Sequence, residues 1–423
     1  MDCPSIKLPG RRSPYLICTN QINQTLYQPP FIVMKKLLFS LCLFAITLSF
    51  AFAQTTTKDT VKPAPAPVSP LSTPGMAGPL TINPEPLKVG SIYISGVASG
   101  LAQFQNSVYP GDKPAQSDVS NGQVFIQKVD GVFQFFLQVG TYSLPDLGAP
   151  YFRSTIAPAG FFGTFPQGFI KLAPTKNFSI EVGKLPTLIG AEYTFSFENM
   201  NIQRGLLWNQ ENAVNRGVQL NYTAGPVTLA VSYNDGLYSN NYNWLWGSLA
   251  WTINGANTLA VIGGGSTSRT SISTFVTPLY LNNEQIYNLI YTHTAGQWTI
   301  QPYLQYTSVP ASPVYNTTQE ATTFGAALLA SYAVPNSGFS IPFRLEYINS
   351  TGSAAGGAPS LIYGPGSNAW SATVTPTYQY KRFFARAELS YVKANNITNG
   401  FGLGPNGADD TQSRALLEVG FLF

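Results

Sequence analysis

The stretch of sequence that decides the fold is 370–393, which reads WSATVTPTYQYKRFFARAELSYVK. Over 370–380, apolar residues alternate with Ser, Thr or Gln, and over 383–393 they alternate with Arg386, Glu388 and Ser390. Successive side chains of a β-strand point to opposite faces. Each half therefore predicts a strand with one apolar and one polar face, and the two residues between them predict a tight turn.

The same period of two recurs from residue 91 to the C-terminus. It predicts an all-β chain of about sixteen strands, with fourteen and eighteen as alternatives. The predicted strands are 91–104, 122–129, 132–141, 167–173, 177–185, 216–223, 227–234, 244–253, 257–265, 284–294, 298–308, 322–333, 339–349, 370–380, 383–393 and 413–423. Most of them approach the ~9–11 residues that a tilted strand needs to cross a bilayer.

Short and long connections alternate between these strands without exception. The long connections fall at 105–121, 142–166, 186–215, 235–243, 266–283, 309–321, 350–369 and 394–412. Tight periplasmic turns that alternate with long external loops are typical of a transmembrane antiparallel up-and-down β-barrel, which we predict for 89–423. Pro302, Pro342 and Pro376 fit this fold poorly, because a closed barrel has no edge strand, and local bulges are expected there.

The composition agrees with strands that contact lipid. Charged residues make up 10% of the 423 residues and aromatic residues 13%, whereas soluble domains carry about 25% charged residues. The longest apolar run, 37–53, is the only one that approaches the ~20 residues of a spanning helix. These features exclude a soluble enzyme and a helical membrane protein. They predict apolar strand faces toward lipid, polar faces toward the lumen, and aromatic girdles formed by Trp244, Trp251, Trp298, Trp370, Tyr291 and Tyr391.

The N-terminal residues predict export. Residues 34–53, MKKLLFSLCLFAITLSFAFA, have the basic, apolar and small-residue regions of a signal peptide cleaved before Gln54. Residues 1–33 are then an over-extended gene start, and the Pro-rich 54–88 is a periplasmic tether or a periplasmic contact arm. All three Cys, five of 23 basic and one of 19 acidic residues lie in 1–53. The mature chain therefore has no disulfide, and its 18 charges of each sign give no reason to expect nucleic acid as a partner.

Charged residues are expected at two places that face the lumen. The longest connection, 186–215, carries the candidate constriction residues Glu192, Glu198, Arg204 and Glu211, with Arg216 at its end, together with many apolar residues. We hypothesise that it folds into the barrel and narrows it; an external lid or a subunit contact is the alternative. The candidate lumen-wall residues are Lys171, Glu181, Arg344, Glu346, Arg386, Glu388, Arg414 and Glu418.

Catalytic chemistry has little support in the sequence. The single histidine, His293, shares a strand face with Tyr287, Leu289 and Tyr291 and is expected to be structural. A barrel hydrolase would need it beside a serine and a carboxylate, and no pattern places such partners. Asp409-Asp410 is interpreted as a solvated turn rather than a calcium site. We expect no metal, no cofactor and no catalytic residue.

The residues around the longest connection resemble a known family. The segments are GKLPTLIGAE at 183–192, NMNIQRGLLW at 199–208, NRGVQL at 215–220 and NDG at 234–236. They are similar to the OmpL-like β-barrel porins of Gram-negative bacteria, although Asn215-Arg216-Gly217 stands where His-Thr-Gly is expected. The resemblance extends over about 91–423. It implies an outer-membrane channel for small hydrophilic solutes, without cofactor.

The expected function is passive diffusion of small hydrophilic solutes through an outer-membrane porin of a Gram-negative-type bacterium. The expected partners are outer-membrane lipid, lipopolysaccharide and the solutes themselves. A homotrimer is an expectation from barrel size and family resemblance. The alternative function is a closed barrel that serves as an anchor or adhesin through its external loops.

Overall fold

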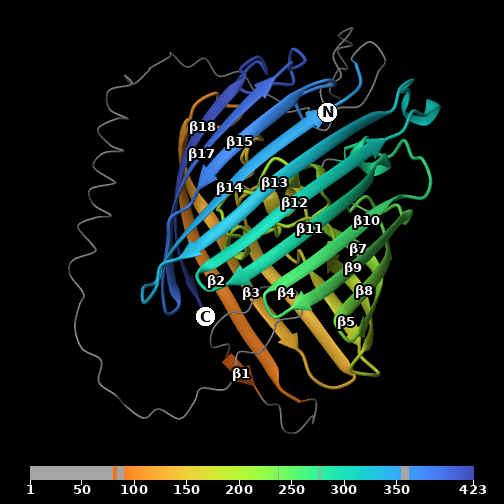
Figure 1. Cartoon of the computed structure of the whole chain (residues 1–423), viewed down its shortest axis with the longest axis vertical. Helices are drawn as coiled ribbons and strands as arrows, with labels where there is room; N and C mark the ends of the chain where they lie inside the picture. Colours follow the sequence, from red (N-terminus) through yellow and green to blue (C-terminus); the bar gives the residue numbers. More distant parts are fainter. Residues whose placement is uncertain (1–79, 83–89, 237, 275, 277, 354–361) are drawn as a thin grey trace, which may run out of the picture. The chain divides into compact units, whose positions relative to one another are not determined.

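The computed structural model describes residues 80–82, 90–236, 238–274, 276, 278–353 and 362–423 (Figure 1). Predicted segments 1–33 and 34–53, and most of 54–88, lie outside the described residues. The strands are β1 (Leu80–Ile82), β2 (Ile92–Gln105), β3 (Ala115–Lys128), β4 (Phe133–Tyr142), β5 (Gly168–Leu172), β6 (Phe178–Pro186), β7 (Val214–Ala224), β8 (Val227–Asn234), β9 (Trp244–Asn254), β10 (Asn257–Ser266), β11 (Gln285–Ala295), β12 (Trp298–Val309), β13 (Ala321–Ala333), β14 (Phe339–Ser350), β15 (Asn368–Val374), β16 (Thr377–Tyr380), β17 (Phe383–Asn395) and β18 (Thr411–Leu422).

Strands β2 to β18 form a closed antiparallel barrel. Each strand pairs with its neighbours in the chain, and β18 pairs with β2 to close the sheet. Because β15 and β16 both pair with β14 and with β17, they are the two halves of one strand. The barrel therefore has sixteen strands, which confirms the predicted fold and count. Closure satisfies the backbone hydrogen bonds that lipid cannot provide.

Strand β1 lies within the range predicted as a tether. It pairs with β2 through Leu80 and Ile94, Thr81 and Tyr93, and Ile82 and Ile92. Strand β18 pairs with β2 from Val97 onward. Strand β1 therefore pairs with the start of β2, on the same edge of β2 that pairs with β18 farther along the strand.

On most strands the polar face points into the barrel. On β14, Arg344 and Glu346 are 0% and 5% exposed, whereas Leu345 and Tyr347 are 50% and 44% exposed. On β17, Arg386 and Glu388 are buried and Leu389 is exposed in the same way. This is the reverse of a soluble barrel and confirms the predicted orientation of both faces.

Three details differ from the expectations. Strand β3 begins at Ala115 instead of 122, because the polar segment 115–121 continues to pair with β2 across a register shift at Ser99/Gly100. At Pro302 and Pro376 the pairing between strands is interrupted, but the strand register is the same before and after the interruption. These prolines therefore lie at gaps in the hydrogen-bond ladders and not at bulges. Pro342 faces the gap that contains Pro376.

The prediction of an aromatic girdle is wrong for Trp244. Trp251, Trp298 and Trp370 are each 43% exposed on the outer face, as expected. Trp244 is fully buried inside the barrel, where it stacks on Trp246 at 5.3 Å between ring centroids.

Within the described residues, helical structure consists of short turns in the connections. These are α2 (Ala157–Gly160), η3 (Ser196–Glu198), η4 (Trp208–Gln210), η5 (Leu281–Asn283) and η6 (Pro313–Tyr315). No helix in the described part of the chain has the length and apolar character of a bilayer-spanning helix.

Candidate functional site

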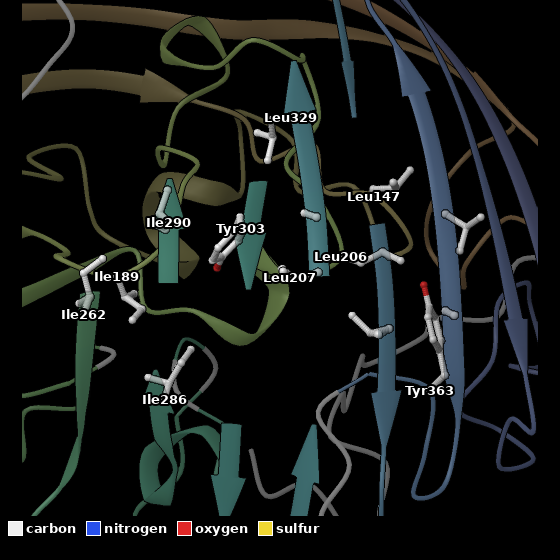
Figure 2. Close-up of a cluster of buried hydrophobic side chains, with 14 of the residues drawn as sticks. Leu147, Ile189, Leu206, Leu207, Ile262, Ile286, Ile290, Tyr303, Leu329 and Tyr363 are labelled. Carbon is white, nitrogen blue, oxygen red and sulfur yellow. The ribbon is translucent and has the colours of Figure 1, made fainter. Parts of the chain in front are cut away.

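The connection between β6 and β7, residues 187–213, lies against the inner wall of the barrel; we call it the inner loop. Its apolar side chains Phe195, Ile202, Leu206 and Leu207 are fully buried. Figure 2 shows Ile189, Leu206 and Leu207 of this loop in one cluster with inward side chains of the strands, such as Ile290 and Tyr303. Burial of these apolar side chains favours the folded loop by about 1.5–3 kcal/mol for each large one.

Arg344 of β14 links the inner loop to the wall. Its guanidinium contacts Glu192 of the loop at 2.5 Å and Glu346 of the same strand at 3.1 Å, and it donates to the carbonyl of Gln203 at 2.8 Å. Glu192 accepts a further bond from the backbone N–H of Gly205. Two carboxylates on one buried arginine compensate part of the cost of removing all three charges from water.

Arg386 and Glu418 form a second link, on β17 and β18. The Nε atom of Arg386 lies 3.0 Å from Glu418 Oε2, and the guanidinium also donates to the carbonyls of Ser196 and Asn199. Glu418 accepts a bond from the Ser196 hydroxyl at 3.1 Å. Both partners of this wall pair therefore bind the η3 turn of the inner loop, and Arg386 also binds the residue after it.

Two more wall charges hold the loop without a charged partner. Glu388 accepts bonds from the backbone N–H groups of Ile202 at 2.5 Å and Gln203 at 3.2 Å. Arg414 donates to the side chain of Gln203 at 3.0 Å and to the carbonyls of Asp146 and Ala149. Glu346 accepts a bond from the backbone N–H of Leu207 in the inner loop. All predicted wall residues of β14, β17 and β18 thus contact the inner loop.

Arg204 connects the inner loop to a second connection, 143–167. It pairs with Asp146 at 2.6 Å, donates to the carbonyl of Thr194, and lies over the Trp208 ring at 4.6 Å. Asp146 could not be identified from the sequence, because one acid in a 25-residue connection has no periodic signal. The backbone of Arg204 pairs with the same segment.

The charged neighbours of Glu211 are acids, among them Glu192 and Glu346. Its carboxylate accepts a bond from the hydroxyl of Tyr303, and one of its oxygens has no partner among the described residues. Burial raises the pKa of Glu211 to about 8, and the Tyr303 hydrogen bond acts in the opposite direction. Burial likewise raises the pKa of Glu192 to about 7, against the attraction of Arg344. Glu198 caps η3 by accepting the N–H of Phe195 at 3.1 Å.

The remaining predicted residues lie away from this network. Lys171 and Glu181 form an inward pair of β5 and β6 at 3.1 Å. The expectation for Arg216 is wrong: it shares the outward phase of β7 with Val218 and Leu220, so it does not line the lumen. Buried amide side chains, which no sequence pattern singled out, line much of the rest of the wall, from β2 beside β18 round to β12; they are Gln103, Gln105, Asn121, Gln123, Gln127, Gln134, Gln138, Gln219, Asn234, Asn288 and Gln305.

His293 lies on β11 with its Nδ1 atom 2.8 Å from the amide oxygen of Asn257. Within the described ranges, no group of three His, Cys, Asp or Glu side chains is arranged to hold a metal ion. The arrangement can position polar solutes and ions by charge and hydrogen bonding along the lumen.

Comparison with known families gives a match that covers the whole barrel. Residues 91–423 match the model of the BBP2 family, the OmpL-like beta-barrel porin-2 family. The chain belongs to this family. A search of curated proteins gives no match.

Solved structures of outer-membrane proteins have the same fold as this member of the BBP2 family. OmpT of Vibrio cholerae is 12% identical with a TM-score of 0.55, and the match covers 82% of this chain and 100% of that one. The anion-selective porin of Comamonas acidovorans is 12% identical with a TM-score of 0.52, covering 78% and 99%. The outer-membrane channel DcaP of Acinetobacter baumannii is 10% identical with a TM-score of 0.53, covering 78% and 97%. These similarities show that the chain has the fold of an outer-membrane porin barrel.

Proposed function

We propose that the protein is a passive channel for small hydrophilic solutes, with the inner loop as its constriction. The observation that carries the proposal is the set of buried links from Arg344, Arg386, Glu388 and Arg414 to the inner loop. A loop held at several points of the inner wall narrows the lumen by a fixed amount. Rings of charge and pore width then decide which solutes pass.

The charges of the constriction support a preference for cations or neutral polar solutes. Arg204, Arg344 and Arg386 each form an ion pair with a carboxylate, although Arg204 and Arg344 each keep one nitrogen without a partner in the described part of the chain. Among the described residues, Glu211 and Glu284 form no ion pair, and each keeps one carboxylate oxygen without a partner. Amides line much of the rest of the wall, and an amide hydrogen-bonds neutral polar groups without selecting a charge. The same proposal includes contacts of the outer face with outer-membrane lipid and lipopolysaccharide. It also includes the expectation that the protein catalyses no reaction.

A planar-bilayer recording of the purified mature protein tests the proposal most directly. Discrete conductance steps are expected, and the reversal potential in a salt gradient is expected to show a weak cation selectivity that increases as Glu211 ionises near its pKa of about 8. Swelling of liposomes in small neutral sugars is expected in parallel. Absence of both conductance and swelling contradicts the channel.

The second candidate is a closed barrel that acts as an anchor or adhesin. One observation favours it: the buried apolar cluster joins four connections to the wall, through Leu147, Leu206, Tyr363 and Leu403. Figure 2 shows the first three of these side chains inside the barrel, where they fill part of the lumen. This candidate predicts no conductance. A homotrimer is also proposed; a trimer form is recorded for OmpT of Vibrio cholerae, and the mass of the protein in detergent tests it.

A further inference from the structure

On the outer face, four neighbouring strands bring two rows of side chains into register. The upper row is Leu137 of β4, Gly168 of β5, Lys184 of β6 and Arg216 of β7. The lower row is Phe135, Ile170, Val182 and Val218. Ile170, Val182 and Val218 are 48%, 49% and 42% exposed, so both rows belong to the lipid-facing phase.

These rows line a groove of about 780 Å³, which Phe165 and Tyr242 also border. Strand β5 has only five residues, and Gly168 contributes no side chain beside Lys184. The groove therefore opens next to the lysine. Its size lies in the ~300–1,000 Å³ range of small-ligand sites, and most of its side chains are apolar.

The upper row carries an uncompensated positive charge. Lys184 and Arg216 lie directly opposite each other, an arrangement that is unfavourable for like charges. Arg216 is neutralised by Asp235 at 2.7 Å, and both cations lie near the ring of Tyr238. Lys184 donates to the carbonyl of Phe165 at 2.9 Å, and among the described residues it has no carboxylate within ion-pair distance.

Another outward cation provides the contrast. Lys393 shares the exposed phase of β17 with Tyr391, close to the external end of its strand, and it pairs with Asp410. Lys184 lies two residues before the end of β6 and Arg216 two residues after the start of β7, also at the external ends. A cation at this height is adjacent to lipid headgroups, where its cost is small and anionic groups attract it.

We propose that this groove is a binding site for one phosphorylated lipid of the outer leaflet. The phosphate pairs with the Lys184 ammonium and approaches Arg216. One acyl chain passes over Gly168 and lies along Phe135, Ile170, Val182 and Val218. The ligand supplies the negative charge that the upper row lacks and covers the apolar lower row. The site is independent of the channel proposed above.

Native mass spectrometry of the folded protein in detergent tests the site. The probes are a diacyl phosphatidic acid and a phosphatidylcholine with the same acyl chains. The unsubstituted protein is expected to retain one phosphatidic acid in preference to phosphatidylcholine. Lys184→Gln is expected to reduce that retention about fivefold, as removal of one basic residue near an anionic headgroup does. Gly168→Leu is expected to reduce the retention of both lipids by filling the groove.

Lys393→Gln is the matched control, since it removes an outward cation at the external end of a strand outside the groove. It is expected to leave the retention unchanged, and heat-modified mobility verifies that each variant is folded. Equal retention by Lys184→Gln, or equal retention of the two lipids, overturns the proposal. So does full displacement by inorganic phosphate, which indicates a free-anion site. A changed oligomeric mass without changed lipid retention assigns the groove to a subunit contact instead.

Discussion

The wall formed by β14, β17 and β18 and the wall formed by β6 and β7 place their cations on opposite faces of one sheet. Arg344, Arg386 and Arg414 face the lumen and are at most 6% exposed. Lys184 and Arg216 lie in the outward phase with exposed Val182 and Val218. A shift of one residue in phase decides whether a cation finds the carboxylates and carbonyls of a loop or the region of the lipid headgroups.

The partners of the two sets differ accordingly. The inner cations are surrounded by acceptors from the same chain, so they fix the inner loop in one position. On the outer wall, Lys184 has one backbone acceptor, and its charge remains available to a ligand. The four predictions below test the inner side of this contrast, from the largest expected effect to the smallest.

Replacing 195–208 with a short Gly-Ser linker removes most of the segment that the inner wall holds. Single-channel conductance is expected to rise severalfold, because the lumen loses its narrowest part. Deletion of 271–274, whose side chains are exposed, is the control and is expected to leave conductance unchanged. An unchanged conductance in the 195–208 variant would show that the inner loop does not limit the pore.

Arg344→Met removes the cation that holds Glu192 and Glu346 and leaves two buried carboxylates unpaired. The free energy of unfolding is expected to fall by about 3–5 kcal/mol. Urea titration in detergent micelles measures it, and recordings are expected to show current fluctuations from a released inner loop. The exposed Lys381→Met is the control; an equal loss there would contradict a specific role of Arg344.

The third prediction concerns the pH dependence of the inner loop. The pKa of Glu211 is raised to about 8 by burial, so the folded state binds this proton more tightly than the unfolded state. The free energy of unfolding is therefore expected to fall as the pH rises from about 4.5 through about 8. Over the upper part of that window Glu211 becomes charged, and cation selectivity is expected to increase.

Reversal potentials recorded between pH 6 and pH 9 measure this change. Glu211→Gln is expected to flatten the profile, because the amide cannot ionise. Glu320→Gln, at the external start of β13, serves as the carboxylate control. A profile that Glu211→Gln leaves intact would assign the titration to another group.

The smallest effect is expected for the pair Lys171–Glu181. Its separation is 3.1 Å, but the lysine side chain is 23% exposed and the pair does not contact the inner loop. Lys171→Gln is expected to change the free energy of unfolding by less than about 1 kcal/mol, with conductance unchanged. A large effect would show that this pair belongs to the constriction.

The direction of most side chains could be predicted from the sequence. Arg344, Glu346, Arg386 and Glu388 alternate with apolar residues, so their inward position follows from the strand period. The outward position of Arg216 could be predicted in the same way, since it lies on the same strand face as Val218 and Leu220. The position of Trp244 was not, because both phases of 244–251 are largely apolar and offer no polar face for comparison.

The sequence by itself determined the barrel, because a period of two and alternating connection lengths are local properties of the chain. Only the tertiary structure decided which groups meet. Glu192 and Arg344 are 152 residues apart in sequence, and no local pattern encodes their contact. The row of Leu137, Gly168, Lys184 and Arg216 likewise exists only through the register of four strands. Periodicity fixes the face on which a side chain lies, whereas closure of the barrel fixes its neighbours.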